Sequence, residues 1–401
     1  MITRIAILLI LMAVVPDLYI DRRFLRRIKG RRAMLRRLLW WLPTLGMIAY
    51  TMVFVFDRQF APSDIKILNV YLFLVGLLIT PKCLFALCSA IGWGVKKMIR
   101  RKANYGNIVG VVMVVLNWYV LFYGSFVGFD QITVREMTYE SAELPKAFDG
   151  YRIVQFSDAH VGTYIGGREH LLRAVVDTIN AQSPDMVVFA GDLQNREPQE
   201  IRPFVDVLGG IKAKDGVFSV IGNHDYSDYI EATPDIKAEN EKETRELERK
   251  MGWRLLVNEH EVVRRGADSI VIAGLDNDGD GKKFPQRGDV RKALEGVSDS
   301  AFVVMAEHDP TCWRRKILPE SRAQLTLSGH THAMQFMIGN WSPASFVYKE
   351  WGGLFSEGAR ALIVSTGIGG FIPFRFGVPG EIVVITMRRL KVENLRLKIE
   401  N

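Results

Sequence analysis

Cysteine is scarce in this chain, which excludes a disulfide framework. Three cysteines occur in 401 residues. Cys83 and Cys88 lie in an apolar stretch and Cys312 stands alone, so we expect small buried side chains or, at most, one free thiol. The sequence also contains no internal repeat and no low-complexity segment.

Acidic residues are scarce in the first 130 positions, where 18 Lys and Arg stand against 5 Asp and Glu. The rest of the chain holds 34 basic and 39 acidic residues, so the excess of positive charge is confined to the N-terminal part. A nucleic-acid-binding surface places such an excess on the folded domain. We therefore expect no nucleic-acid partner.

Long apolar stretches fill the N-terminal part, at residues 5–20, 38–56, 67–93 and 107–129. A spanning helix needs about 20 residues, so the last three are long enough and the first is marginal. The first stretch lacks a small-residue cleavage site and precedes a basic segment, which indicates an uncleaved anchor. The sequence predicts a transmembrane anchor over residues 1–130, with about four helices.

The loops between these stretches predict an orientation. Residues 21–37 carry nine basic residues and one acid, residues 96–102 carry five basic residues and no acid, and residues 57–66 are balanced. By the positive-inside rule the first and third loops face the cytoplasm. Residues after the fourth stretch should therefore be extracytoplasmic, in a multi-pass protein of the cell membrane. The first basic loop also indicates contact with anionic membrane lipids.

Lys82 lies beside Pro81, near the middle of the third stretch. An intramembrane charge indicates a functional site by default. A proline-kinked helix whose lysine snorkels or meets a carbonyl accounts for it equally well. The sequence leaves both readings open.

Beyond a polar linker at 131–149, short apolar strands alternate with helices, which predicts an α/β domain at 150–390 and a tail at 391–401. We expect two sheets layered between helices, an α/β/β/α sandwich. The predicted strands are 151–157, 185–190, 216–221, 269–275, 301–306, 324–328, 335–338, 361–365 and 381–386. The predicted helices are 167–182, 200–208, 233–250 and 311–318.

Five short motifs place metal-ligating side chains after these strands, where open α/β sheets bind their ligands. Five of the seven histidines belong to them. Oxygen ligands alternate with imidazoles, a mixture that suits Mn, Fe or Zn. Side chains two apart in extended backbone point the same way, so the side chains of each paired motif can converge on one centre. The motifs are Asp158-Ala159-His160, Gly191-Asp192, Gly222-Asn223-His224-Asp225, Glu307-His308 and Gly329-His330-Thr331-His332.

With these motifs in this order, residues 145–390 resemble the calcineurin-like metallophosphoesterase superfamily, and the apolar stretches resemble its membrane-bound bacterial branch. The resemblance implies two divalent metal ions. Asp192 would bridge them, and the general acid would be His224, oriented by Asp225. The first ion would be held by Asp158, His160 and His332, and the second by Asn223, His308 and His330.

One departure from the family pattern concerns substrate choice. Members often follow the last histidine with two glycines and a glutamine, whereas this chain has Ala333-Met334-Gln335. The backbone there would approach substrate differently. His170 and His260 match no motif, and we expect surface or helix positions for them.

Three functions follow from these patterns. The leading hypothesis is a membrane-tethered phosphoesterase that hydrolyses a phosphodiester or phosphomonoester through metal-activated water. The membrane location points to a lipid or cell-envelope phosphoester as substrate. The second is a pyrophosphate hydrolase of a nucleotide-linked lipid precursor, which the predicted topology disfavours because such precursors are made in the cytoplasm. The third is a non-catalytic membrane sensor of the same fold. No protein partner is indicated.

Two further segments have a plain and a sharper interpretation. Residues 276–281 imitate the start of a calcium loop, but the twelfth position is Arg287, so we expect an acidic loop at a strand end. The segment 367–380, with Phe371, Phe374 and Phe376, is either packing at the domain edge or a lip of the active site that touches lipid.

Overall fold

The computed structural model describes residues 2–57, 62, 64–281 and 284–390. The chain divides into two compact units, an N-terminal unit of residues 1–127 with 229–231 and a C-terminal unit of residues 128–228 with 232–401. The predicted tail at 391–401 lies outside the described residues.

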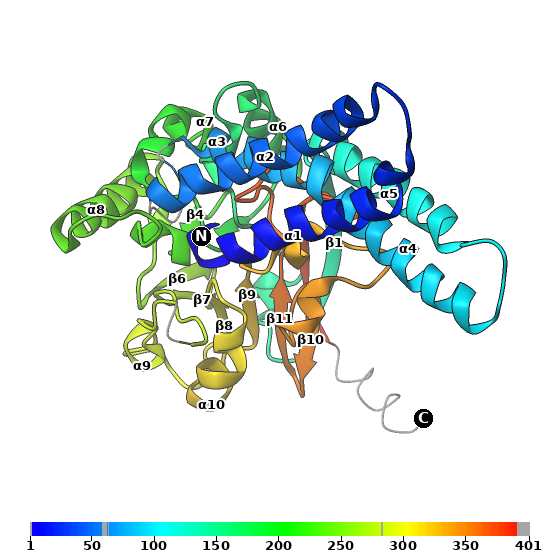
Figure 1. Ribbon diagram of the computed structural model, residues 1–401. Helices are drawn as coiled ribbons and strands as arrows, with labels where there is room; N and C mark the ends of the chain where they lie inside the picture. Colours follow the sequence, from blue (N-terminus) through cyan, green and yellow to red (C-terminus); the bar gives the residue numbers. More distant parts are fainter. Residues whose placement is uncertain (1, 58–61, 63, 282–283, 391–401) are drawn as a thin grey trace. The chain divides into compact units, whose positions relative to one another are not determined.

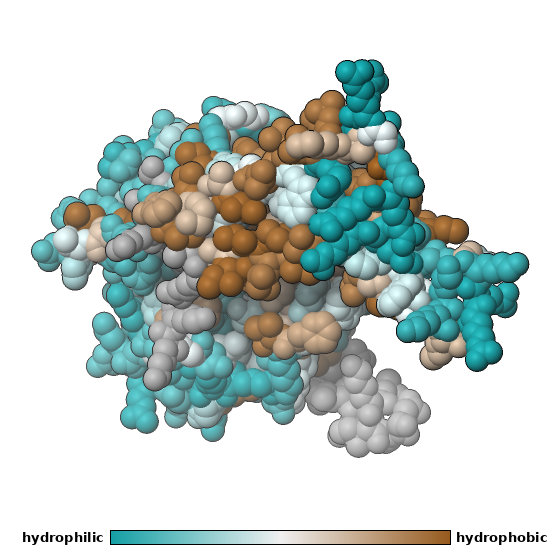
Figure 2. Space-filling view, viewed as in Figure 1, coloured by the Kyte–Doolittle hydropathy of each residue, from teal (hydrophilic) through white to brown (hydrophobic). Residues whose placement is uncertain are grey.

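The N-terminal unit is helical and apolar. Three of its described segments, Ala33–Asp57, Ile65–Met98 and Gly106–Gly128, are long and apolar enough to cross a membrane. Many of their large apolar side chains are exposed, and Figure 2 shows apolar residues gathered over the helices of this unit. The helices are α1 (Ile2–Arg23), α2 (Ala33–Asp57), α3 (Ile65–Leu74), α4 (Thr80–Met98) and α5 (Gly106–Tyr123).

A polar cluster inside this unit ties α1, α2 and α4 together. Lys82 Nζ on α4 lies 2.9 Å from Asp17 Oδ2 on α1 and donates to Thr44 Oγ1 on α2 at 2.8 Å. The Trp40 indole donates to Asp17 Oδ1 at 2.9 Å, and its ring lies under the ammonium group. The partner of Lys82 is thus a carboxylate of another helix. The polar cluster fixes the three helices relative to one another, which contacts between apolar surfaces alone do less specifically.

The described residues of the C-terminal unit form two six-stranded sheets, with strand orders β1-β12-β2-β3-β4-β5 and β10-β11-β9-β8-β7-β6. In the first sheet β2, β3 and β4 are parallel, and in the second β7, β8, β9 and β11 are parallel. The strands of the first sheet are β1 (Ile132–Ser141), β2 (Arg152–Phe156), β3 (Met186–Phe189), β4 (Val217–Ser219), β5 (Arg254–Leu255) and β12 (Gly380–Arg389). Those of the second are β6 (Glu259–Arg265), β7 (Asp268–Gly274), β8 (Val303–Ala306), β9 (Leu325–Ser328), β10 (Gly353–Glu357) and β11 (Arg360–Val364).

The central strands bury both faces, and three large apolar cores lie among the described residues of this unit. Alternate residues of β2, such as Ile153 and Val154, enter different cores, because successive strand side chains point to opposite faces. One core lies between the sheets, one under α6 (Glu169–Ala181) and α7 (Val205–Leu208), and one under α9 (Val290–Ala293) and α10 (Leu318–Glu320). Figure 1 shows these helix pairs on opposite sides of the sheets, which confirms the predicted α/β/β/α architecture. The charged helix α8 (Pro234–Lys250) agrees with the helix predicted at 233–250.

Several local predictions differ from the structure. The segment predicted as a linker at 131–149 contains β1, which pairs in parallel with β12 about 250 residues later. The strand predicted at 335–338 is reduced to isolated β-bridges at Phe336 and Ile338, because Gln335 belongs to a 3-10 turn, His332–Gln335, in left-handed backbone. The predicted helix at 200–208 consists of two 3-10 turns and the short α7. The predicted helix at 311–318 contains a π-helical turn, Trp313–Ile317, before α10.

Candidate metal centre

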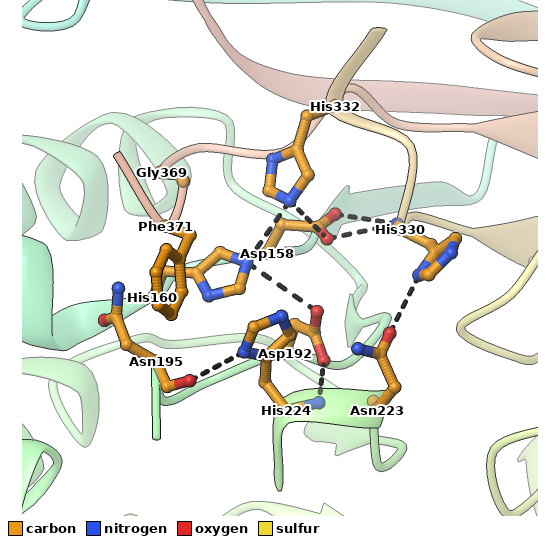
Figure 3. Close-up of polar contacts among 12 residues, drawn as sticks. Asp158, His160, Asp192, Asn195, Asn223, His224, His330, His332, Gly369 and Phe371 are labelled. Carbon is orange, nitrogen blue, oxygen red and sulfur yellow. Dashed lines mark hydrogen bonds and ion pairs between the residues drawn. The ribbon is translucent and has the colours of Figure 1, made fainter. Parts of the chain in front are cut away.

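The candidate ligands follow the carboxyl ends of parallel strands in both sheets. Asp158 follows β2, Asp192 follows β3 and Asn223 follows β4, while His308 follows β8 and His330 follows β9. Parallel strands bring their carboxyl ends to one edge of each sheet. The structure brings all seven predicted metal ligands into one cluster, most of which Figure 3 shows.

Left-handed backbone, rather than extended backbone, makes these side chains converge. The φ angle is +53° at Asp158, +44° at His160, +62° at Asp192, +76° at His330 and +50° at His332. Non-glycine residues rarely adopt such angles, and when they do they concentrate at functional sites. Strand alternation therefore does not apply to either pair. Asp158 and His160 share one group of candidate ligands, as predicted, whereas His330 and His332 fall in different groups.

Three groups of side chains offer ligand atoms that lie within 4.8 Å of one another. Two of these groups share Asp192. They are Asp158 with His160 and His332, His160 with Asp192 and His224, and Asp192 with His308 and His330.

Short distances connect these groups into one centre. His332 Nε2 lies 3.2 Å from Asp158 Oδ1, and His308 Nε2 lies 3.2 Å from Asp192 Oδ2. The same Asp192 oxygen is 3.6 Å from His160 Nε2, and Asn223 Oδ1 accepts a hydrogen bond from His330 Nδ1 at 2.8 Å. Asp192 thus lies between the two halves of the cluster.

The electrostatics of the cluster favour a cation. Burial would lower the pKa of His308, but the carboxylates of Asp192 and Asp158 raise it well above the usual range. Burial, with His224 adding to it, lowers the pKa of His160 to about 3, so that imidazole is neutral and able to ligate. Two buried carboxylates thus attract positive charge while neighbouring imidazoles offer lone pairs.

The donor set fits divalent metal ions. The Nε2 atoms of His160 and His332 lie 3.2 Å apart, and each also lies within 3.6 Å of a buried carboxylate oxygen. Carboxylate oxygen, amide oxygen and imidazole nitrogen together suit Mn, Fe or Zn.

Close backbone approach explains one glycine of the motifs. A Cβ atom on Gly222 would lie 2.2 Å from Asp192 Oδ1. Only glycine lets the loop after β4 come so near the shared carboxylate.

His224 is held by a group that the sequence did not reveal. Its Nδ1 donates to the Asn195 carbonyl oxygen at 2.6 Å (Figure 3). The sequence predicts Asp225 as the orienting group, yet that carboxylate accepts four backbone N–H bonds, from Asp192, Leu193, Gln194 and Gly222. A carboxylate has about four acceptor positions. Asp225 therefore fastens the loops after β3 and β4 to each other rather than orienting the imidazole.

Two residues at the cluster, Tyr348 and Asp309, were not predicted, and a third, Phe371, belongs to the segment for which a lip of the active site was one of two interpretations. Tyr348 places its hydroxyl 3.0 Å from His330 Nε2, and Asp309 Oδ2 lies 3.5 Å from the same nitrogen. The Phe371 ring lies 5.5 Å from the ring of His224. Asp309 directly follows the predicted ligand His308, so its position in the sequence could have identified it. Tyr348 lies in an irregular segment, where no sequence pattern indicates that it belongs to the site.

The loop that imitates a calcium site is held by protein cations. The Asp278 carboxylate lies 2.9 Å from Arg315 and 2.6 Å from Lys316. Its backbone N–H donates to Glu307 Oε1 at 2.9 Å, which connects the loop to the residue before His308. His170 is exposed on α6, and His260 lies on β6 with Nδ1 bonded to the Ala293 carbonyl.

Comparison with known families agrees with the fold and with the cluster of candidate metal ligands. The family Calcineurin-like phosphoesterase matches residues 151–334. The family Probable Calcineurin-like phosphoesterase, transmembrane domain, matches residues 3–129. The chain belongs to the calcineurin-like metallophosphoesterases, a class of hydrolases, and is membrane-associated.

Relatives of the chain include membrane metallophosphoesterases. The uncharacterized metallophosphoesterase YkuE of Bacillus subtilis (strain 168) is 29% identical over 73% of this chain and 99% of its own length. The transmembrane protein with metallophosphoesterase domain of Danio rerio is 30% identical over 62% of this chain, which spans 55% of that relative. The UDP-2,3-diacylglucosamine pyrophosphatase LpxG of Chlamydia trachomatis serovar D is 26% identical over 60% of this chain and 86% of its own length.

Proposed function

We propose that this protein is a membrane-anchored phosphoesterase that uses two divalent metal ions to hydrolyse a phosphodiester or phosphomonoester. The observation that carries the proposal is the position of Asp192, a buried carboxylate shared by two groups of candidate ligands in a calcineurin-like domain. A shared carboxylate is what a two-metal phosphoesterase needs between its ions.

The ligand sets divide around that carboxylate. When bound, two ions of Mn, Fe or Zn would supply positive charge for the phosphoryl oxygens and make a water molecule more acidic. Asp192 would bridge the two sites. The first set is Asp158, His160 and His332, and the second is Asn223, His308 and His330.

His224 would serve as the general acid. Because its Nδ1–H is held by the Asn195 carbonyl, the proton for the departing oxygen would come from Nε2. As water attacks phosphorus and the ester bond breaks, this proton neutralises the leaving alkoxide. Burial lowers the pKa of His224, and Asp192 opposes that effect. A bound phosphoester adds further negative charge, which favours the protonated imidazole.

The location of the site suggests the kind of substrate. The basic loops before the second and fourth apolar stretches favour an extracytoplasmic domain. A phosphoester of the lipid bilayer or the cell envelope is then within reach of a tethered enzyme.

A pyrophosphate hydrolase of a nucleotide-linked lipid is the second candidate. The similarity to LpxG favours it. The predicted topology opposes it, because nucleotide-linked precursors are made in the cytoplasm. A C-terminal unit found inside the cell, with turnover of a nucleotide diphosphate-linked lipid, would favour this candidate.

The test uses the full chain in detergent micelles with a chromogenic phosphodiester and the corresponding monoester. We expect hydrolysis that requires Mn²⁺, stops with a chelator and is lost in Asp192→Asn. Asp177→Asn is the matched control, since Asp177 is exposed on α6. Metal binding with no turnover of a broad phosphoester panel would instead favour a non-catalytic sensor.

A further inference from the structure

A run of exposed apolar side chains follows the last candidate ligand, His332. We call it the apolar lip, and it consists of Met334, Ile338, Trp341, Phe346 and Val347, which are exposed by 43%, 60%, 45%, 80% and 64%. Single exposed apolar residues are ordinary, but several large ones within fourteen residues form a patch of the kind that marks an interaction site.

The lip is a built surface. Ile338 and Trp341 exchange backbone hydrogen bonds of 2.9 and 3.1 Å, and the Trp341 ring meets the Phe346 ring edge-on at 5.9 Å. Ser342 Oγ donates to the Ala333 carbonyl at 2.6 Å, which fastens the lip to the ligand loop.

The lip is also fastened to the aromatic segment at 371–376. The Gln335 amide donates to the carbonyls of Ile372 and Phe374 at 2.9 and 2.7 Å. The rings of Phe336 and Phe376 stack at 5.5 Å. The two segments therefore form one continuous surface, whose other end is Phe371, beside His224.

This surface borders the candidate metal centre on two sides. Tyr348, directly after Val347, reaches His330 Nε2 at 3.0 Å. Met334 lies two residues beyond His332, and the backbone of both is left-handed. A molecule with its phosphate at the metal centre can therefore extend an apolar group over the lip.

We propose that the lip holds the hydrocarbon chain of a lipid phosphoester, so that the substrate is an amphiphile presented at a bilayer surface. This inference rests on the proposed phosphoesterase function. Tryptophan and phenylalanine are favoured where apolar chains meet water at a membrane. The same polypeptide carries apolar helices long enough to span a membrane, and β1 begins four residues after the last of them ends at Gly128. Because the chain is membrane-associated, a lipid is the apolar ligand that it meets most readily.

The experiment compares two esters of one chromogenic phenol, measured with the full chain in phospholipid–detergent mixed micelles. One is a water-soluble short-chain phosphodiester, and the other carries a diacylglycerol in place of the short chain. The test variant is Phe346→Ser with Val347→Ser. The matched control is Ile236→Ser on α8, where the side chain is 51% exposed.

We expect kcat/KM of the wild type to be at least about tenfold higher for the lipid ester, since each buried apolar side chain contributes appreciably to binding. The lip variant should lose most of this preference while its rate on the soluble ester stays within about twofold. The control should keep the preference. A wild type without preference for the lipid ester, or a preference unchanged in the lip variant, overturns the inference.

A second readout does not depend on turnover. The lipid ester with a photoreactive group in its acyl chain should crosslink to residues 338–347 in the wild type and not in the lip variant. Crosslinks confined to the spanning helices overturn the inference. A lip variant that changes only the oligomeric state also overturns it, because the lip would then be an interface between copies. If the wild type cleaves neither ester, the proposed function fails, and the crosslinks alone decide the role of the lip.

Discussion

The backbone N–H of His224 donates to Asp192 Oδ1 at 2.8 Å, and the backbone N–H of Asp192 donates to Asp225 Oδ2 at 3.0 Å. These bonds join the loops after β3 and β4. The proposed general acid is therefore positioned by the carboxylate that is proposed to bridge the metals. The second oxygen of Asp192 still faces His308 at 3.2 Å.

Replacing His224 should slow the hydrolysis of esters with poor leaving groups most. In His224→Ala, kcat for an alkyl phosphodiester should fall about 10²–10⁴-fold, because the alkoxide leaves without a proton. A nitrophenyl ester, whose leaving group needs no proton, should lose much less. Rates over a series of leaving groups measure the difference.

The matched control for this prediction is His170→Ala, since His170 is exposed on α6. Equal losses for alkyl and nitrophenyl esters in His224→Ala would contradict a role in proton donation. They would indicate that His224 acts in metal or phosphate binding, which its place in a candidate ligand group also permits.

The polar cluster of Lys82 and Asp17 in the N-terminal unit predicts that the stability losses of two substitutions are not additive. Lys82→Met leaves the buried Asp17 carboxylate unpaired and Asp17→Leu leaves the ammonium unpaired, so each should cost on the order of 3–5 kcal/mol of stability. The double variant should recover most of that loss. Thermal unfolding of the solubilised full chain gives the stabilities of the wild type, the two single variants and the double variant. If the single variants melt normally yet lose activity, Lys82 has a functional role instead.

Much of the candidate centre could be predicted from the sequence. Each ligand motif follows a strand that can be recognised from its own apolar residues. The fold could be predicted in outline for the same reason, since periodicity identifies β2, β3, β7, β8 and β9. β1 was missed because its partner β12 is distant in sequence and its outer residues are polar and exposed.

The parts that could not be predicted depend on tertiary contacts. Asn195 holds His224 through a backbone carbonyl, which any residue could supply. The Asp225 carboxylate accepts hydrogen bonds from backbone N–H groups that lie 33 and 32 residues earlier in the chain. The strand predicted at 335–338 is reduced to isolated bridges because the left-handed turn that begins at His332 continues to Gln335, a conformation that non-glycine side chains do not favour.

Glu248 on α8 predicts a pH dependence of stability. Burial raises the pKa of this carboxyl to about 8, and Asp225 adds to the effect. Since the folded pKa lies above the value of 4.5 for an exposed Glu, the contribution to stability is complete below pH 4.5 and is lost as pH rises through 8. The loss within this window is about 1.4 kcal/mol per pH unit.

Glu248→Gln cannot ionise, so its melting temperature should fall less steeply than that of the wild type between pH 5 and 8. Calorimetry of the full chain across this range measures the slopes. Glu246→Gln, on the same helix with an exposed side chain, is the control and should follow the wild type. Parallel slopes for wild type and Glu248→Gln would contradict the assignment.

The basic loops predict the side of the membrane on which the site lies. An alkaline phosphatase reporter fused after residue 390 should be active, because the C-terminal unit would be outside the cytoplasm. The same reporter fused after residue 30, in the first basic loop, should be inactive. The reverse pattern would contradict the proposed orientation and strengthen the case for a nucleotide-linked substrate.

The central claim is that Asp192 bridges two metal ions, and metal content measured on the full chain tests it most directly. After reconstitution with Mn²⁺ and removal of loose metal, elemental analysis should find about two ions per wild-type chain. Asp192→Asn should hold one ion or fewer and lose at least about a hundredfold in activity on the same sample. Two ions retained by Asp192→Asn, with activity unchanged, would contradict the account.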